Sequence, residues 1–338
     1  MKQKRVIITH CGGPEGLQLI EDEIPEPKAG EVRVKILTTG VAFADVLMRE
    51  GLYPGTPSIP FSPGYDIVGV IDKLGPGAPT LALGQMVAAL TVFGGYAQFI
   101  CLPESELVPV PAGLDPVEAV SVVLNYVTAY QMLHRVALIK RGERALIHGA
   151  AGGVGTALLQ LGKLVELQMY GTASRPKHEL VSSLGGIPID YKNEDFVERI
   201  REATGDGMDV VFDPIGGKNW WRSYRILRQE GRLIGYGFSS ALTGDRNRKL
   251  TMALGWALLF LLKLLPDRRT VMLYSIASVK QRHPEWFRED LTLLFDLLAN
   301  RRINPIIAER MPLSEAARAH ELLDKAAVSG KIVLICHP

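Results

Sequence analysis

Short hydrophobic runs broken by Gly and Pro extend from residue 6 to residue 101 of this chain. Such runs with frequent turn residues predict a β-barrel-like domain of many short strands. Residues 42–49 differ, because their apolar positions have helical spacing and Gly51 follows them, which predicts one short helix. The clearest expected strands are residues 32–37, 66–71 and 96–100.

A different pattern begins at Asp115. This residue, with Pro116 next and Glu118 three positions on, is typical of a helix start, and the helix should run towards Leu133. Beyond it, apolar runs alternate with amphipathic segments, as in a doubly wound α/β domain. The expected strands are residues 145–149, 167–172, 187–190, 209–213 and 231–236, and the expected helices are residues 153–165, 176–184, 194–203 and 218–227.

The chain after residue 240 contains its most apolar stretch, residues 252–262. This stretch is shorter than the ~20 apolar residues that span a bilayer. A buried helix, a lid over an apolar substrate, a dimer surface and a membrane-surface helix are all compatible with residues 250–265. Later we expect strands at residues 271–276, near residue 306 and at residues 331–335, and helices at residues 284–300 and 314–326.

A glycine-rich turn lies between the first expected strand of the α/β region and the helix that follows. The turn reads A-x-G-x-x-G, from Ala150 to Gly155. Strand, tight turn and helix in this order are what a dinucleotide pyrophosphate requires. Gly152 would let the backbone approach the phosphates and Gly155 would let the helix lie close to its strand, with the pyrophosphate on the helix N-terminus.

The end of the next expected strand indicates which dinucleotide is bound. NAD sites usually place Asp or Glu there, whereas this chain has Ser174, Arg175, Pro176 and Lys177. A hydroxyl and two cations without a carboxylate suit a ribose 2′-phosphate, so the sequence favours NADPH. The alternative is that Arg175 and Lys177 belong to a solvated loop.

Composition restricts the partners. The chain has 338 residues, 47% hydrophobic and 22% charged, as expected of a soluble protein of two domains. With 38 Lys and Arg against 36 Asp and Glu, nothing suggests a nucleic-acid surface. The three cysteines are far apart in sequence and odd in number, and the first apolar run is too short for a signal peptide, so we expect a reducing, cytoplasmic location.

Stretches distributed along the whole chain match a known family. They are residues 40–45, 49–53, 63–69, 128–130, 149–155, 189–191, 209–217 and 330–333. Together they resemble the medium-chain dehydrogenase/reductases, and among them the zinc-free, NADPH-dependent quinone oxidoreductases of the zeta-crystallin type. The resemblance implies an α/β fold: a GroES-like barrel of residues 1–121 and 279–338, and a Rossmann NADP(H)-binding domain of residues 122–278. It also implies an apolar small-molecule substrate and a homodimer.

The resemblance implies roles for individual residues. Tyr53 matches a tyrosine at the mouth of the active-site cleft, Thr128 a position near the nicotinamide carboxamide, and Tyr191 a position near the adenosine half. The remaining implied cofactor contacts are Ala151, Gly152, Gly153, Val154, Gly155 and Thr156 at the pyrophosphate, Ser174, Arg175 and Lys177 at the 2′-phosphate, and Tyr236, Gly237, Phe238 and Ser239 beside the nicotinamide ribose.

Zinc is not expected. Zinc members of the superfamily carry a Cys in the segment matching residues 40–45, and Gly-His-Glu where this chain reads Gly64, Tyr65 and Asp66. Three isolated cysteines cannot build a structural four-ligand site. Another departure is Ala42, where the family often has Asn.

Without zinc, the cofactor carries the chemistry, and the protein must orient it and exclude water. Quinones and α,β-unsaturated carbonyls suit hydride transfer of this kind, and Tyr53 is the candidate hydrogen-bond donor. Simple packing is the alternative for Tyr53. Asp45 could orient the substrate or cap local structure, and we interpret it as a cap. We interpret His148 as a hydrogen-bonded core residue, and Trp220, Trp221 and the apolar stripe as core or dimer surface.

Two other functions remain open. Vesicle amine transport proteins share the apolar segment after the nucleotide domain, which suggests a membrane-associated NADPH-binding protein with weak turnover. An enoyl thioester reductase would need a basic path for a phosphopantetheine or nucleotide tail. Arg246, Arg248 and Lys249 are candidates for such a path, although a solvated charge run also accounts for them.

Overall fold

The computed structural model describes residues 2–77, 81–242 and 248–337. The chain divides into two units, Met1–Val127 with His283–Pro338, and Thr128–Arg282. The boundaries expected from sequence were residues 121/122 and 278/279. Residue 246, one of the three candidate cations for an acyl tail, lies outside the described residues, whereas Arg248 is exposed.

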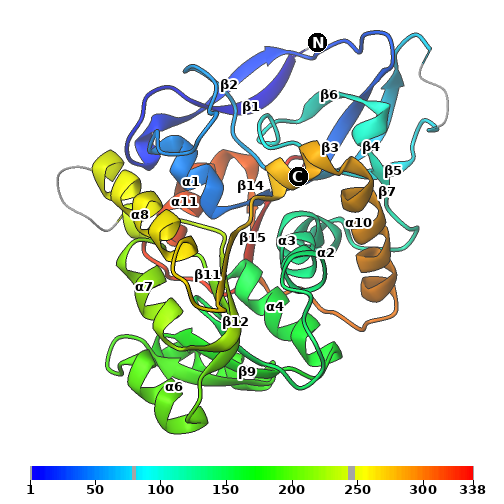
Figure 1. The fold of residues 1–338 in the computed structure, drawn as a ribbon. Coiled ribbons are helices and arrows are strands. Elements are labelled where there is room, and N and C mark those ends of the chain that lie inside the picture. The colour runs from blue at the N-terminus through cyan, green and yellow to red at the C-terminus, as the bar shows by residue number, and fades with distance from the viewer. Residues whose placement is uncertain (1, 78–80, 243–247, 338) are drawn as a thin grey trace. The chain divides into compact units, whose positions relative to one another are not determined.

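The first unit is built on an antiparallel sheet with one parallel edge pair (Figure 1). Its strand order is β14 (Ile307–Pro312), β15 (Lys331–Ile335), β3 (Glu31–Val41), β4 (Asp66–Leu74), β5 (Met86–Leu90) and β7 (Val108–Pro109), while β6 (Phe99–Pro103) also pairs with β3. Alternate β3 side chains Val32, Val34 and Ile36 are fully buried, which is the period of a strand with one face in the core. A hairpin of β1 (Lys2–Ile8) and β2 (Leu17–Glu23) and helices α1 (Phe43–Arg49), α2 (Pro116–Ser121), α10 (Pro284–Ala299) and α11 (Ala316–Asp324) complete the unit.

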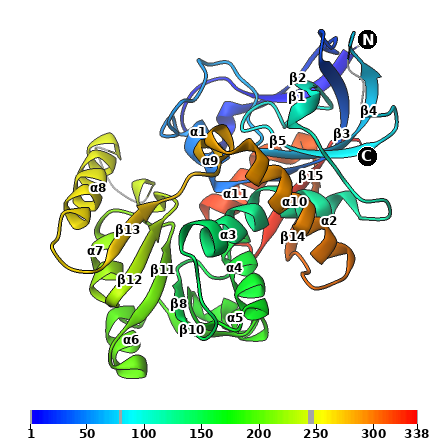
Figure 2. The same cartoon turned by 45° about the vertical axis from the view of Figure 1, so that its right-hand side comes forward.

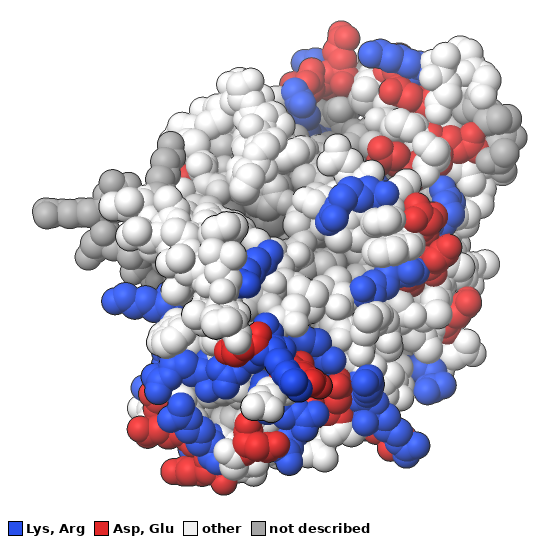
Figure 3. All heavy atoms as spheres, viewed as in Figure 1, with Lys and Arg blue, Asp and Glu red and all other residues white. Residues whose placement is uncertain are grey.

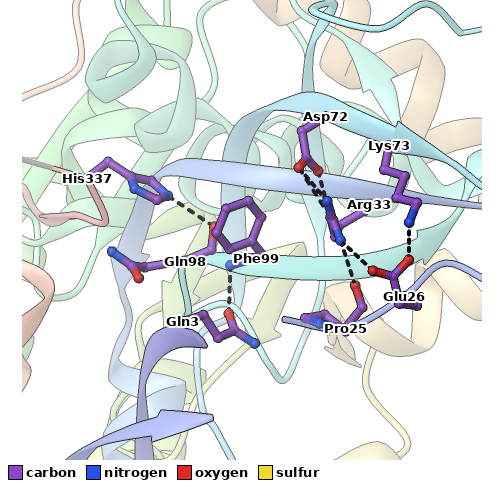
Figure 4. Close-up of polar contacts among 9 residues, drawn as sticks. All are labelled: Gln3, Pro25, Glu26, Arg33, Asp72, Lys73, Gln98, Phe99 and His337. Atoms are coloured by element: carbon purple, nitrogen blue, oxygen red, sulfur yellow. Dashed lines mark hydrogen bonds and ion pairs between the residues drawn. The ribbon is translucent and has the colours of Figure 1, made fainter. Parts of the chain in front are cut away.

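The loop before β3 is fixed to the sheet by Arg33 (Figure 4). The Arg33 guanidinium donates to both carboxylate oxygens of Asp72 on β4 at 2.8–3.2 Å, and to Glu26 at 3.2 Å. Glu26 also pairs with Lys73. Planar guanidinium groups suit such a bidentate carboxylate contact, so one buried cation joins three separate segments.

The second unit is a six-stranded, wholly parallel sheet (Figure 2). The order is β10 (Gly186–Asp190), β9 (Gln168–Ala173), β8 (Arg144–Ile147), β11 (Met208–Asp213), β12 (Leu227–Gly235) and β13 (Thr270–Leu273). Counted from β8, this is 3-2-1-4-5-6, the order of the doubly wound dinucleotide-binding fold. Helices α4 (Gly153–Leu164) and α5 (His178–Ser183) cover one face, and α6 (Phe196–Thr204) and α7 (Lys218–Arg225) cover the other.

The helix expected from Asp115 is present as one helical run over residues 116–136, in which α2, α3 (Val127–Gln131) and two π-helical turns alternate. The side chain of Asp115 accepts from Val117 N at 2.9 Å and so caps it. The expected strand at residues 271–276 is shorter than the pattern suggested, because β13 ends at Leu273 and α9 (Ile276–Arg282) begins three residues later.

The apolar stretch forms α8 (Arg248–Lys263), which packs on α7 and β13. Leu259 and Leu262 are buried against the unit, whereas Leu254, Phe260 and Leu261 are each at least 60% exposed. The interpretation of the stripe as core therefore holds for one side of the helix only. The same division applies to the tryptophan pair, of which Trp220 is fully buried and Trp221 is 44% exposed.

Candidate functional site

The glycine-rich turn joins the central strand β8 to α4. Gly149, at the start of the turn, has φ +64°, a left-handed conformation that favours glycine. Gly152 has extended φ and ψ and precedes the first helical residue, Gly153. The first backbone N–H groups of α4 have no partner within the helix, so the turn presents donors of the kind that bind a pyrophosphate.

Two glycines of the turn have different steric roles. A Cβ on Gly155 would overlap Gly149 O and lie 2.7 Å from the Cα of Ala150, so only glycine lets α4 pack this close to the turn. A Cβ on Gly152 would lie 3.2 Å from Gly149 O, a tight contact that small movements could relieve. The Thr156 hydroxyl donates to Gly153 O at 3.0 Å and so stabilises the first turn of the helix.

The residues expected at the 2′-phosphate follow β9 directly. Ser174 precedes a 3₁₀ turn, Arg175–Lys177, in which Arg175 is exposed and Lys177 is partly buried. Asp190, the last residue of β10, pairs in register with Ala173, the last residue of β9. The residues after both strands therefore share one edge of the sheet.

Lys192 brings a further cation to this edge, one that the sequence analysis missed. Burial lowers the pKa of Lys177, and the nearby charge of Lys192 lowers it further. Two ammonium groups that repel each other here would both gain from an anion between them. Tyr191, beside them, is 53% exposed.

The carboxylate of Asp190 is engaged in its own turn. It accepts from Lys192 N at 3.2 Å and from the Asn193 side chain at 2.8 Å, and the hydrogen bond from Asn193 is the main cause of its lowered pKa. Asp190 therefore serves the turn after β10, and the edge keeps a positive character.

A second turn follows directly after the carboxyl end of β11. The Asp213 carboxylate is fully buried and accepts from Ile215 N at 2.8 Å and Gly216 N at 3.1 Å. Ser239 N in turn donates to Pro214 O at 3.0 Å, so this turn holds the segment after β12. β8 and β11 are the neighbours at which the strand order reverses, the place where doubly wound sheets bind ligands.

The remaining expected cofactor contacts differ in exposure. Tyr236, Gly237 and Ser239 are partly exposed, while Phe238 is 3% exposed and packs edge-on against Trp220 at 5.2 Å between ring centroids. The Phe238 side chain thus anchors the segment in the core through its contact with Trp220. Thr128 is 5% exposed within α3.

The first unit holds Tyr53 in a tyrosine pair. The Tyr53 and Tyr65 hydroxyls are 2.6 Å apart and their rings meet edge-on. Burial raises the pKa of Tyr53, so its hydroxyl stays protonated at neutral pH. Asp45 accepts from Ala42 N at 2.9 Å and from Gly64 N at 3.0 Å, which is the capping role considered for it.

Zinc does not fit these groups. Asp66 forms a buried ion pair with Lys331 at 2.9 Å, and each oxygen of Asp45 accepts a backbone N–H. Tyr65 stands where zinc members of the superfamily carry His, and residues 40–45 contain no Cys. Across the described ranges, no group of three or more His, Cys, Asp or Glu residues could hold a metal ion. Carboxylates already satisfied in this way are not available as ligands.

Known proteins resemble the chain over its whole length. An alcohol dehydrogenase GroES-like family model matches residues 28–112, and a family model described as zinc-binding dehydrogenase matches residues 186–334. Quinone oxidoreductase 1 of Escherichia coli is 31% identical, with 96% of this chain and 97% of the relative covered. The chain belongs to the zinc-free medium-chain dehydrogenase/reductase family of quinone oxidoreductases.

The chain is also similar to a solved structure and to a vesicle membrane protein. The E. coli quinone oxidoreductase crystallised with NADPH has a TM-score of 0.87 and 30% identity, covering 98% of this chain and 99% of that chain. The synaptic vesicle membrane protein VAT-1 homolog of Danio rerio is 32% identical over 99% of this chain and 70% of its own length. The expected α/β fold, with GroES-like and Rossmann parts, is thus confirmed for this family member. No described helix is long and apolar enough to cross a bilayer.

Proposed function

We propose that this oxidoreductase family member uses NADPH to reduce quinones or α,β-unsaturated carbonyls without zinc. The observation that carries the proposal is the sheet edge after β9 and β10. There Ser174, Arg175, Lys177 and Lys192 gather beside the glycine-rich turn, and the carboxylate of Asp190 is held in its own turn. A 2′-phosphate is the group that this charge distribution favours.

Different groups of the second unit would bind different parts of the cofactor. The N-terminus of α4 would bind the pyrophosphate through backbone N–H groups, and Lys177 with Lys192 would neutralise the 2′-phosphate. Bound NADPH supplies the hydride. The Asp213 turn and the segment Tyr236 to Ser239 would hold the nicotinamide half, because the turn follows β11, at the reversal of strand order, and the segment follows the neighbouring β12 and is bonded to that turn.

Tyr53 is proposed to bind the acceptor's carbonyl oxygen. If Tyr65, which is 2% exposed, donates to the more exposed Tyr53, the Tyr53 hydroxyl hydrogen is left to point at a ligand. A hydrogen bond there would stabilise the enolate-like charge that develops when a hydride reaches the acceptor carbon. Solvent can supply the final proton, so no stronger protein acid is required.

The test compares NADPH and NADH oxidation with an ortho-quinone and an α,β-unsaturated ketone as acceptors. Lys177→Ala should raise KM for NADPH by about 10-fold, with kcat and the NADH kinetics little changed, because only NADPH carries the 2′-phosphate. Lys140→Ala is the matched control, since Lys140 is exposed and precedes β8 at the opposite edge.

Contrary outcomes separate the parts of the proposal. NADPH binding without reduction of either acceptor would refute the substrate assignment. Equal use of NADH and NADPH by the wild-type protein would refute the 2′-phosphate site.

One observation favours a second candidate, an NADPH-binding protein that associates with membrane surfaces and turns over weakly. On the face shown in Figure 3, Lys and Arg are interspersed with Asp and Glu, while the surface over α8 is mainly uncharged. The exposed large apolar residues of α8 are Leu250, Leu254, Trp256, Phe260 and Leu261. Sedimentation with liposomes, lost in a Phe260→Ser/Leu261→Ser variant, would support this candidate, and absence of wild-type sedimentation would remove it.

A further inference from the structure

A line of buried hydrogen bonds crosses the second unit directly beneath the two turns. Gly149 N lies 3.2 Å from Thr172 Oγ1, and Thr172 Oγ1 lies 3.1 Å from His148 Nδ1. His148 Nε2 lies 3.0 Å from Ser223 Oγ, and Ser223 Oγ lies 2.7 Å from Asp213 Oδ2. The four side chains are at most 2% exposed and come from the ends of β8, β9 and β11 and from α7. We call this line the His148 relay.

The chemistry of the groups fixes the direction of every bond. An ionised Asp213 only accepts, so the single hydroxyl hydrogen of Ser223 goes to Asp213, and Ser223 Oγ must accept from His148 Nε2–H. His148 Nδ1 is then the acceptor for the Thr172 hydroxyl. Thr172 Oγ1 in turn accepts from the backbone N–H of Gly149, so each donor in the line has one acceptor.

The two ends of the relay are the two turns of the candidate cofactor site. At one end, Thr172 holds the glycine-rich turn twice, through Gly149 N at its hydroxyl and through Ala150 N at its carbonyl, at 3.0 Å. At the other end, Asp213 receives Ile215 N and Gly216 N of the turn after β11. One uninterrupted line of hydrogen bonds therefore joins the pyrophosphate turn to the turn expected beside the nicotinamide.

We propose that the His148 relay sets the geometry of both cofactor-binding turns, with Thr172, His148 and Ser223 as positioning residues for the dinucleotide. The inference rests on the proposed NADPH function and assigns a role to groups that the hydride transfer itself does not use. Gly149 needs this support because it is the left-handed residue from which the turn departs. A buried network in which every member is satisfied holds one arrangement against its alternatives.

The surroundings keep the imidazole neutral. Burial lowers the pKa of His148, the charge of Arg222 lowers it as well, and the charge of Asp213 opposes them. The Phe196 ring meets the imidazole edge-on at 4.7 Å, and the Arg222 guanidinium lies over the same ring, 4.4 Å from its centroid. The relay is therefore a neutral line ending on one carboxylate.

Variants at Thr172 test the proposal at the turn. Thr172→Val keeps the shape of the side chain but leaves Gly149 N and His148 Nδ1 without a partner, and it should raise the Kd for NADPH by about 10-fold. Thr172→Ser keeps the hydroxyl and should bind like the wild type. A Kd for Thr172→Val within about twofold of the wild type would overturn the proposal.

Ser223→Ala tests whether the effect travels along the line. Ser223 has no contact with the glycine-rich turn among its hydrogen bonds, yet its loss frees the imidazole to change tautomer and should raise the Kd for NADPH by about threefold. The change should appear in KM for NADPH and not in kcat. An unchanged Kd in folded Ser223→Ala protein would show that the turn is held locally and would overturn the relay.

A spectroscopic measurement reads the relay in the wild-type protein itself, with one variant used only to assign the signals. Nitrogen-15 NMR of His148, assigned by the signals absent from His148→Asn, should show a proton on Nε2 and none on Nδ1. An Nδ1–H tautomer or an imidazolium would reverse the line and overturn the proposal. If the wild-type protein does not bind NADPH at all, the proposed function fails first, and this NMR result still reports on the relay alone.

Discussion

Each unit buries a cluster of polar side chains, and the two clusters are stabilised in opposite ways. In the first unit, Lys331 and Asp66 form an ion pair at 3% and 0% exposure, and Asp45 lies nearby with its pKa raised by burial to about 7. In the second unit, the His148 relay is neutral along its length and carries charge only at Asp213. The first cluster depends on protonation states, whereas the relay depends on the orientation of hydrogen bonds.

The two clusters differ because they fix different backbone segments in place. Asp45 and Asp66 accept N–H groups of Gly64 and Gly40, in the two segments where zinc members of the superfamily carry ligands. Here the two carboxylates fix that backbone. The relay fixes turns that must meet an anionic cofactor, where a further buried carboxylate near the phosphates would be unfavourable.

The largest expected effect comes from breaking the ion pair of the first unit. Lys331→Met leaves Asp66 charged and buried without its partner, so the free energy of unfolding should fall by about 3–5 kcal/mol. Hydrogen exchange of β3 and β15 measures the loss in that unit. Lys331→Met/Asp66→Asn should recover part of it, and a loss below about 1 kcal/mol in the single variant would contradict a buried ionised pair.

The next effect is a pH dependence from Asp45. Burial raises the pKa of Asp45 to about 7 in the folded chain, against 3.8 for an unperturbed aspartate side chain. The folded state therefore holds the proton more tightly than the unfolded state does. The free energy of unfolding that depends on this group therefore has its full value below about pH 4. It falls as pH rises through 7, by on the order of a few kcal/mol. Lys331 and Asp66 are the charges that face it, with opposite effects on its pKa.

Urea unfolding followed at several pH values measures this slope, and carbon-13 NMR of the Asp45 carboxyl locates its titration. Asp45→Asn should flatten the slope, because the amide does not titrate in this range. A carboxyl that titrates near pH 4 would show that Asp45 is better hydrated than its burial indicates.

A steric change in the glycine-rich turn tests the second unit. Gly155→Ala places a Cβ against the backbone of Gly149 and Ala150, so it should cost about 1–3 kcal/mol of stability and weaken NADPH binding. Gly162→Ala, on the same helix, is the matched control, because its Cβ would meet the flexible Met169 side chain 2.5 Å away. Equal losses in thermal unfolding for the two variants would argue against a special role for the turn.

Local sequence patterns predicted much of this molecule because its strands and helices follow them. The order strand, glycine turn and helix around Gly155 needed only periodicity and the glycine spacing. The strand expected at residues 32–37 is longer in the structure, where β3 continues to Val41. The Thr39 hydroxyl donates to Asp66 O at 2.8 Å, a contact with another strand that makes a buried polar residue acceptable.

The relay and the extra cation could not be found in this way. His148 was interpreted as a hydrogen-bonded core residue, yet its partner Ser223 lies 75 residues away, and no local pattern connects them. Lys192 becomes relevant only because β10 pairs with β9, which places the residues after both strands together. Contacts that depend on the order of strands in the sheet can be found only once the fold is known. Elements that follow from hydrophobic periodicity can be predicted from the sequence alone.

The smallest expected effect decides whether charge or burial makes the Lys331 pair important. Arg141 and Glu166, in the second unit, form an ion pair at 2.6 Å, shorter than the Lys331–Asp66 pair, but their side chains are 78% and 60% exposed. Arg141→Gln should change the free energy of unfolding by less than about 1 kcal/mol, and added salt should remove even that difference. If urea unfolding gave a loss as large as that of Lys331→Met, the charge itself and not its burial would stabilise both pairs, and the contrast between the charged cluster and the neutral relay would lose its physical basis.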